Sequence, residues 1–196
     1  DLDGVACMVC HRATNVVMSD PMAPYTQNAQ MFFLDGPEGS VRNGPYDIAA
    51  GVHPHPTRLS DFLPTGGFCG QCHDTVNPTV AGMRVDGTPT GRDAVLERTY
   101  SEWRYSALSA RGETCQDCHM RDVADPVRAC DEGMPRDYMR RHDLVGSSSW
   151  VLRALATTVP DTGGDWSAAL LRSADKAESF LTEAAELAVT DVALAG

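Results

Sequence analysis

The segment at residues 113–120 has the sequence ETCQDCHM, in which two cysteines stand three positions apart and a histidine directly follows the second. The same pattern, Cys-x-x-Cys-His, occurs in ACMVCHR at residues 6–12 and in FCGQCHD at residues 68–74. Six of the seven cysteines belong to these three copies. A pattern repeated in this way, more than any hydrophobic periodicity, determines the fold that we expect.

Cys-x-x-Cys-His is the pattern of covalent haem attachment. In one helical turn, cysteines three apart lie on one face, where they can form thioethers with the two vinyl groups of one porphyrin. The following histidine then lies beneath the ring and supplies a nitrogen to the iron. We therefore expect three covalently bound haem c groups. Their attachment residues are Cys7, Cys10, Cys69, Cys72, Cys115 and Cys118, and their proximal iron ligands are His11, His73 and His119.

Two other chemistries use Cys-x-x-Cys pairs. A zinc ribbon combines two pairs into a set of four cysteines, and three pairs do not divide evenly into such sets. A thioredoxin-type redox pair is single and follows a strand in a βαβ unit. Haem attachment is therefore the preferred interpretation, because it also explains a histidine after every pair. Zinc and disulfide chemistry remain the alternatives.

The composition agrees with a core that is not made of side chains. Leu, Ile, Val and Phe make up 37 of the 196 residues, and the formal net charge is −11. This combination is usual in chains too poor in apolar groups to fold, and three covalently fixed macrocycles would supply the missing core. The acidic balance argues against nucleic-acid binding, which requires clustered Lys and Arg. No stretch approaches the length of a transmembrane helix.

Three further histidines, His53, His55 and His142, lie outside the motifs. Their number equals the number of expected irons, which predicts two axial histidines for every haem and no open coordination position. Methionine is the rival sixth ligand. His53 and His55 each precede a proline, which favours extended backbone. Residues two apart would then share a face and serve two neighbouring haems, whereas in a polyproline turn the side chains would diverge.

The rest of the sequence predicts a mainly α fold with extensive irregular loops, a haem core and very little β structure. Residues 12–67 are expected to be loop, because they contain the turn sequences DGPEGS and RNGPYD. Apolar residues at helical spacing predict helices at residues 93–111, 147–159 and 165–189, of which the last is the longest.

We expect a single domain overall. In it, residues 1–145 form the trihaem-binding region, and residues 146–196 form a helical C-terminal segment packed on that region.

Several segments resemble the multihaem c-type cytochromes related to hydroxylamine oxidoreductase. They are GVACMVCHR, NGPYD, GGFCGQCHDTVNP, TYSEW, ARGETCQDCHM and RRHDLVG, spread over residues 4–146. The resemblance implies that His142, a histidine followed shortly by Gly after the last motif, is a distal haem ligand. It also implies a location outside the cytoplasm, extracellular, at the cell surface or periplasmic, because thioether attachment is made there. Relatives commonly carry further haem motifs upstream and a strand-rich domain after the long helix, so we expect a trimmed or minimal version.

These features predict an electron carrier and not an enzyme, since haems with two histidine ligands exchange electrons along a haem chain and do no bond chemistry. The alternative is a multihaem oxidoreductase of the nitrite or hydroxylamine type, or a fragment of one, which would need one iron with an open face. Extracellular cytochrome filaments are built from small multihaem units. The expected partners are therefore other cytochromes or redox proteins, including further copies of this chain in a filament, with no nucleic acid and no membrane span.

Overall fold

The computed structural model describes residues 7–14, 32–33, 41–48, 55–123, 126–128, 133, 135–160 and 163–184. The chain divides into two compact units. The first comprises Asp1–Cys118 and Pro126–Asp137, and the second comprises His119–Asp125 and Tyr138–Gly196. The boundary between the units therefore falls inside the third Cys-x-x-Cys-His segment, directly before its histidine.

Short helices and strands make up the first unit, with the last residue of α5 already in the second. In chain order they are α1 (Cys7–His11), β1 (Ala13–Thr14), β2 (Phe32–Phe33), β3 (Arg42–Gly44), β4 (Thr57–Leu59), α2 (Gly66–Gly70), β5 (Thr75–Met83), β6 (Pro89–Glu97), α3 (Thr99–Arg104), α4 (Ala107–Ala110), α5 (Cys115–His119), β7 (Val127–Arg128) and β8 (Pro135–Arg136). Within the described residues, the strands form two-stranded sheets, of which β3–β4 is parallel and β1–β2, β5–β6 and β7–β8 are antiparallel.

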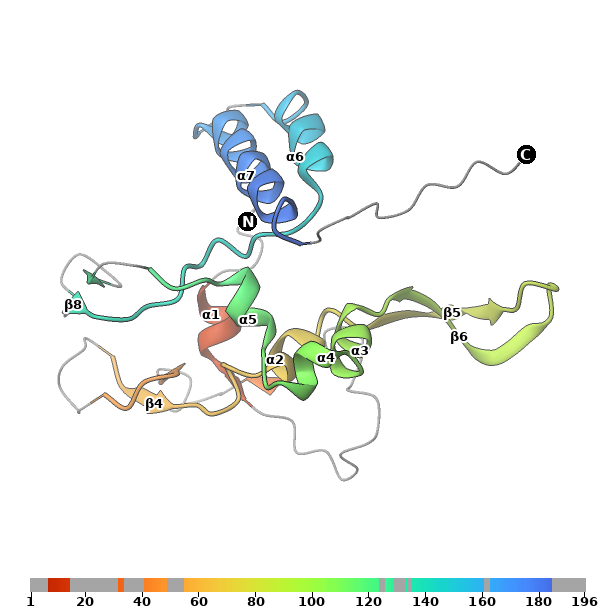
Figure 1. The fold of residues 1–196 in the computed structure, drawn as a ribbon, viewed down its shortest axis with the longest axis horizontal. Coiled ribbons are helices and arrows are strands. Elements are labelled where there is room, and N and C mark those ends of the chain that lie inside the picture. Colours follow the sequence, from red (N-terminus) through yellow and green to blue (C-terminus); the bar gives the residue numbers. More distant parts are fainter. Residues whose placement is uncertain are drawn as a thin grey trace, which may run out of the picture. The chain divides into compact units, whose positions relative to one another are not determined.

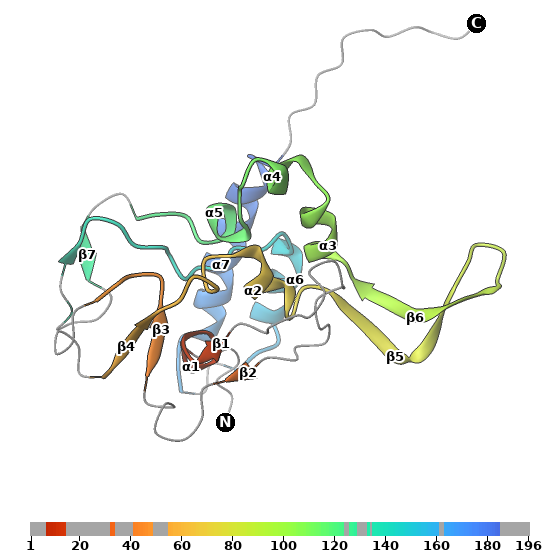
Figure 2. The same cartoon turned by 90° about the horizontal axis from the view of Figure 1, so that it is seen from below.

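The hairpin β5–β6 is the longest of these sheets and extends away from the short helices of its unit in both views (Figure 1, Figure 2). Val85, Asp86 and Gly87 form its loop, in which the backbone N–H of Gly87 donates to the carbonyl of Arg84 at 2.9 Å. Gly87 has φ +80°, and the backbone N–H of Thr88 donates to the carboxylate of Asp86 at 2.9 Å. Glycine is favoured at the last position of a three-residue hairpin loop, because it tolerates the positive φ required there. The prediction of a mainly α fold with very little β structure was wrong, since the described residues are 36% helical and 23% strand, a mixed α/β content.

The single helix predicted over residues 93–111 is replaced by a strand and two short helices. Glu97 still belongs to β6 and pairs with β5. Arg98, with φ −133° and ψ 20°, is not helical, and α3 begins after it. Ser106 then has extended backbone, with φ −86° and ψ 166°, and its hydroxyl accepts the N–H of Leu108. A serine in this position caps a new helix. The apolar spacing that predicted one helix therefore runs through three elements.

Residues 12–67 were predicted as loop, but they contain β1 to β4 and the start of α2. Strands of two or three residues are too short to show a period in the sequence. A polar contact joins two of these strands. Asn43, in the middle of β3, is 3% exposed and donates its side-chain amide to the carbonyl of Ala13 in β1 at 2.7 Å.

The second unit contains α6 (Ser149–Ala156) and α7 (Trp166–Leu181), which lie side by side (Figure 1). Helices were predicted over residues 147–159 and 165–189, and both exist but are shorter: α6 begins at Ser149 and ends at Ala156, and α7 ends at Leu181, before the turn at residues 182–184. Residues 185–189 lie outside the described residues. Ala156, Ala174 and Ala177 are buried. Small side chains at these positions allow the two helices to approach closely.

Charged side chains add to the contact between α6 and α7. Arg153 of α6 donates to Asp175 and to Glu178 of α7 at 2.9 Å each. Lys176 of α7 pairs with Asp143, before α6, at 2.6 Å. These groups are largely exposed, so each pair contributes little to stability on its own.

Few apolar side chains are buried in the described part of the chain. They are Ala13, Phe62, Tyr100, Ala156, Ala174 and Ala177. Only two of them are large, in agreement with the low content of large apolar residues in the sequence.

Candidate haem-attachment sites

Each Cys-x-x-Cys-His segment forms a single helical turn. The first and third coincide with α1 and α5. The second begins in α2 and continues beyond it, because the N–H groups of Cys72 and His73 donate to the carbonyl of Cys69 at 3.1 and 2.9 Å. All six cysteines are free thiols. Cysteines three apart in one turn lie on one side of it, as two thioether bonds to one porphyrin require.

The three histidines share one feature, a hydrogen bond between Nδ1 of the ring and an oxygen. The acceptors are the carbonyl of Asn43 for His11 at 2.6 Å, Oε1 of Glu97 for His73 at 2.8 Å, and the carbonyl of Val145 for His119 at 2.5 Å. An oxygen acceptor requires the proton on Nδ1, which leaves the lone pair on Nε2. Histidines that bind metals usually have this arrangement, in which one nitrogen is oriented by an oxygen while the other binds the metal.

Asn43 of β3 positions the first histidine. Its carbonyl accepts the ring N–H of His11. Its side-chain amide donates to the carbonyl of Ala13, which lies two residues after His11. Both bonds come from one buried residue. The α1 turn and the start of β1 are therefore fixed to the β3–β4 sheet together.

The second histidine is held by the end of the β5–β6 hairpin and the start of α3. The carbonyl of His73 accepts the backbone N–H of Tyr100 at 2.8 Å. Thr75 pairs with Glu97, so the hairpin leaves just after His73 and returns to the same place. The hydrogen bond from His73 lowers the pKa of Glu97 below its ordinary value; burial raises that pKa, and the hydroxyl of Thr99 lowers it again.

Asp74, the residue after His73, makes the next contacts with α3. Its carboxylate is 1% exposed and accepts the hydroxyl of Ser101 at 2.7 Å and a guanidinium N–H of Arg98 at 3.2 Å. A buried carboxylate is stable only when it is paired and hydrogen-bonded. These bonds hold the second segment against the residues that begin α3.

Glycines of α2 allow this segment to pack directly on α3. A Cβ at Gly66 would lie 2.4 Å from Cη2 of Trp103, and a Cβ at Gly70 would lie 2.7 Å from the ring of Tyr100. Carbon atoms that are not bonded approach only to about 3.5 Å. Any larger residue would therefore displace the helix or the aromatic ring.

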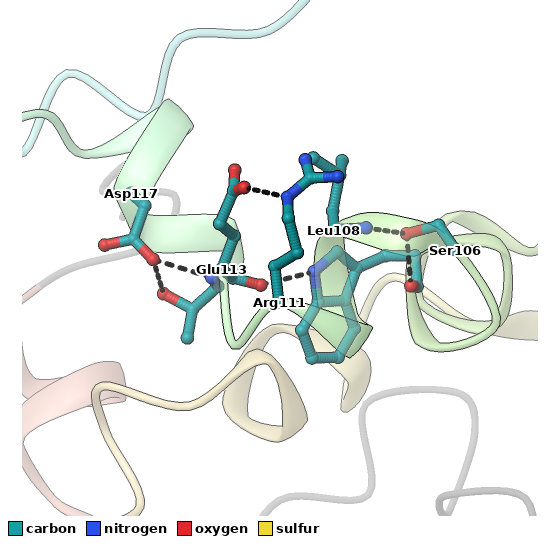
Figure 3. Close-up of polar contacts among 7 residues, drawn as sticks. Ser106, Leu108, Arg111, Glu113 and Asp117 are labelled. Atoms are coloured by element: carbon teal, nitrogen blue, oxygen red, sulfur yellow. Dashed lines mark hydrogen bonds and ion pairs between the residues drawn. The ribbon is translucent and has the colours of Figure 1, made fainter.

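A set of polar contacts leads into the third segment (Figure 3). Trp103 donates its indole N–H to the carbonyl of Glu113 at 2.9 Å, and Arg111 donates to the Glu113 carboxylate at 2.7 Å. Thr114 donates its backbone N–H and its hydroxyl to Asp117 at 2.6 and 2.9 Å. The bond from the backbone N–H of Thr114 to the Asp117 carboxylate is one half of a capping box, and it lies where α5 begins.

His119, the third histidine, contacts the long helix of the second unit. Its ring centroid lies 5.0 Å from that of Phe180 in α7, with an interplanar angle of 45°. Arg121 stacks on the same phenyl ring at 5.5 Å and pairs with Glu183 at 2.8 Å. α7 therefore helps to orient the third imidazole.

Thiols of different segments interact with one another. A hydrogen bond between Cys69 and Cys115 raises the pKa of Cys69 and lowers the pKa of Cys115 to about 7. Burial raises the pKa of Cys10, and the neighbouring Cys7 and Cys72 raise it further. Cysteines of all three segments are thus close enough to influence each other, so the three cysteine pairs lie near one another.

The histidines predicted as distal ligands have different surroundings. His53 lies outside the described residues. His55 is exposed directly before β4, with Nδ1 3.3 Å from the carbonyl of Pro56. His142 is exposed in the second unit and follows Arg141, whose N–H donates to the carbonyl of Arg121 at 2.9 Å. The structure thus brings the His142 segment beside the residues that follow the third motif.

The residues of the three segments fit covalently attached haem. Besides the free thiols and the orientation of the imidazoles, one buried polar group points to a bound partner. Gln71, inside the second motif, is 1% exposed, and neither atom of its amide has a hydrogen-bond partner in the described structure. A buried polar group left unpaired costs about 1–3 kcal/mol. A macrocycle with polar substituents, bound at this segment, would relieve that cost.

The sequence did not identify the acceptors Asn43, Glu97 and Val145. Two of them act through backbone carbonyls, which carry no sequence signal. Glu97 could have been found, because the Asp-Gly turn at residues 86–87 predicts a hairpin. The register of that hairpin brings Glu97 opposite Thr75, two residues after His73.

Comparison with family models, curated proteins and solved structures found no match to the chain. None of the helices in the described ranges is both long enough and apolar enough to span a membrane. Nor do the described side chains form any group of three or more His, Cys, Asp or Glu that could hold a metal ion. A haem iron needs only axial protein ligands, because the porphyrin nitrogens occupy the other positions.

Proposed function

We propose that the protein is a trihaem c-type cytochrome that transfers electrons. The observation that carries this proposal is the geometry common to the three Cys-x-x-Cys-His segments. Each forms a helical turn with two free thiols and a histidine whose Nδ1 is bonded to an oxygen. Neither a zinc ribbon nor a thiol redox pair requires an oriented histidine after the second cysteine.

In this proposal, the two thiols of each segment form thioethers with the porphyrin vinyl groups, and Nε2 of the following histidine binds the iron. Bound haem supplies a one-electron Fe(III)/Fe(II) couple. The oxygen acceptors keep the proton on Nδ1, orient each ring and increase its basicity. The polypeptide thus sets the orientation and the ligand strength of three redox centres.

Distal ligation by His53, His55 and His142 would leave no iron with an open face, and the function would be electron transfer without bond chemistry. The equal numbers of proximal and spare histidines support this ligation. For His142, further support comes from its place on the segment that hydrogen-bonds to the residues after His119.

The clustered attachment cysteines support a row of neighbouring haems within one molecule. We propose that such rows continue between molecules, with other cytochromes or redox proteins as partners, and that copies of this chain assemble into an extracellular filament. Electron microscopy of the native material tests the assembly. Filaments with a regular repeat are expected, and monodisperse monomers that still carry electrons would limit the function to that of a single carrier.

Intact-mass measurement of the denatured protein tests haem attachment. Three haem additions to the polypeptide of 21.1 kDa are expected. The double variant Cys69→Ser, Cys72→Ser should carry two haems, whereas the matched variant Ser109→Ala, outside the motifs, should carry three. A wild-type chain without haem whose cysteines are oxidised in pairs, or one that releases zinc on denaturation, would refute the proposal.

Absorption and electron paramagnetic resonance spectra test the ligation. Only low-spin iron is expected when every haem has two histidine ligands. A substantial high-spin fraction, together with tight nitrite binding, would instead support an oxidoreductase with one open haem.

A further inference from the structure

The three histidine rings differ in the charge of their acceptors. His11 and His119 donate to backbone carbonyls, whereas His73 donates to the carboxylate of Glu97. Hydrogen bonds to an ionised acceptor are about twice as strong as neutral ones. A stronger acceptor draws the proton further from Nδ1 and makes the imidazole a more electron-rich ligand.

The bond from His73 to Glu97 is built into the fold of its unit. Glu97 pairs with Thr75 at the base of the hairpin. The hydroxyl of Thr99 donates to the same Oε1 at 2.9 Å, and the backbone of Tyr100 holds the carbonyl of His73 at 2.8 Å. Three separate contacts therefore keep the carboxylate and the imidazole in register.

Of the described charged groups around His73, Glu97 is the one that acts on the imidazole ring. Asp74 lies next to His73, but its carboxylate is paired with Arg98 and hydrogen-bonded to Ser101. Glu97 makes no such ion pair with an Arg or Lys among the described contacts, and its charge contributes to raising the pKa of Cys72 in the second motif, after the larger effect of burial. The carboxylate is thus close to the attachment site as well as to the ring.

We propose that Glu97 is a positioning residue that gives the haem at Cys69 and Cys72 the lowest reduction potential of the three. This inference rests on the proposed function. A more electron-rich imidazole, with a negative charge behind it, stabilises Fe(III) relative to Fe(II). Reduction adds one electron to Fe(III) and gives Fe(II), with the proton remaining on Nδ1 of His73. The electron comes from a one-electron donor, such as a haem of another cytochrome.

An order of reduction follows from this assignment. The second haem is the last of the three to accept an electron and the first to lose one. In a row of haems, electrons therefore stay mainly on the haems of higher potential, and the second haem is occupied last. His11 and His119, with neutral acceptors, belong to the two haems that are reduced first.

The variant Glu97→Gln tests the assignment in the haem-loaded protein. Glutamine keeps an acceptor oxygen of the same reach and removes the charge. In a spectroscopic redox titration of the three haems, the lowest of the three steps should move to a more positive potential. The expected shift is about tenfold in the equilibrium constant for reduction, or about 59 mV for one electron. One of the three low-spin signals in electron paramagnetic resonance should move with it.

Two further variants serve as controls. Asp86→Asn removes the same charge at the turn of the same hairpin and should leave all three potentials within a small fraction of that shift. Glu97→Asp keeps the charge on a shorter side chain and should retain most of the low potential. If Glu97→Gln and Glu97→Asp raise the potential equally, the effect comes from loss of structure, and the assignment is overturned.

Other outcomes separate this inference from the proposed function. Three covalent haems whose potentials do not respond to Glu97→Gln would overturn the role of Glu97 and leave electron transfer in place. A shift in a step other than the lowest would overturn the proposed order. A wild-type protein without haem would overturn both proposals.

Discussion

Replacement of Gly66 by alanine should weaken the contact between α2 and α3 and destabilise the first unit. A Cβ at Gly66 would lie 2.4 Å from Cη2 and 2.5 Å from Cζ3 of Trp103. Unstrained contacts between carbon atoms begin at about 3.5 Å, so helix and indole must separate by roughly 1 Å. The indole resists this movement because its N–H donates to the carbonyl of Glu113 at 2.9 Å.

The size of the effect follows from three contributions. Overpacking of this kind costs about 1–3 kcal/mol. Loss of the indole hydrogen bond would add about 1 kcal/mol. Alanine offsets about 0.5–1 kcal/mol, because it loses less conformational entropy than glycine in a helix. The free energy of unfolding should therefore fall by about 1–3 kcal/mol, which lowers Tm by about 2–12 °C in a chain of this size.

Thermal unfolding followed by far-ultraviolet circular dichroism measures this change in the haem-loaded protein. Gly44→Ala is the matched control, since a Cβ at Gly44 in the same unit would meet no atom within 4 Å. That variant should be neutral or slightly stabilising. Trp103→Leu removes the outer ring atoms, so the double variant Gly66→Ala, Trp103→Leu should lose less stability than the sum of the two single changes.

Two results would refute this reasoning. The first is a Gly66→Ala protein that unfolds at the same temperature as wild type and as Gly44→Ala. The second is a double variant whose loss of stability equals the sum of the single losses, because additivity would mean that Gly66 and Trp103 do not restrict one another.

Three further predictions concern other contacts. Replacing His142 by alanine should open one iron and produce a high-spin signal in absorption and electron paramagnetic resonance spectra, and an unchanged low-spin spectrum would remove His142 from the ligands. Asp74→Asn takes away the buried counter-charge of Arg98 and should lower the unfolding free energy in guanidinium by about 1–3 kcal/mol; a loss well below that range would contradict the pairing. The hydrogen bond from Arg153 lowers the pKa of Glu178 from 4.5, so the pair stabilises α6 and α7 above that pH and loses its effect as pH falls through the lower, folded-state pKa. Glu178→Gln should flatten this dependence of helix unfolding on acid, and an unchanged acid profile would exclude the pair as its cause.

Local properties of the sequence predicted part of this structure. The helical turns of the three motifs and the helices α6 and α7 depend on spacings within a few residues. Their positions were predicted, although α6 and α7 are shorter than expected. The region around residues 93–111 was not, because the same apolar residues fit a helical period while Asp86 and Gly87 favour a hairpin. The pairing of Thr75 with Glu97 decides between them, and that pairing is a contact between segments distant in the chain.

The candidate sites also depend partly on local sequence and partly on contacts between distant segments. Which histidines follow the cysteine pairs is visible in the sequence, but the oxygen that orients each ring depends on tertiary structure. Asn43 and Val145 act through backbone carbonyls, so any residue type at those positions would offer the same acceptor. Glu97 acts through its side chain, which makes it the one acceptor of the three that mutation can change without moving the backbone.

A single short helix connects the second and third Cys-x-x-Cys-His segments. The backbone N–H of Tyr100 in α3 holds the carbonyl of His73, while the indole of Trp103 in the same helix holds Glu113, just before α5. Because α3 is only six residues long, these two bonds lie within one turn of each other. A displacement of α3 would therefore move both sites together. It follows that the glycine contact at Gly66 has a role beyond stability, since it fixes the position of the helix that spaces the second motif from the third.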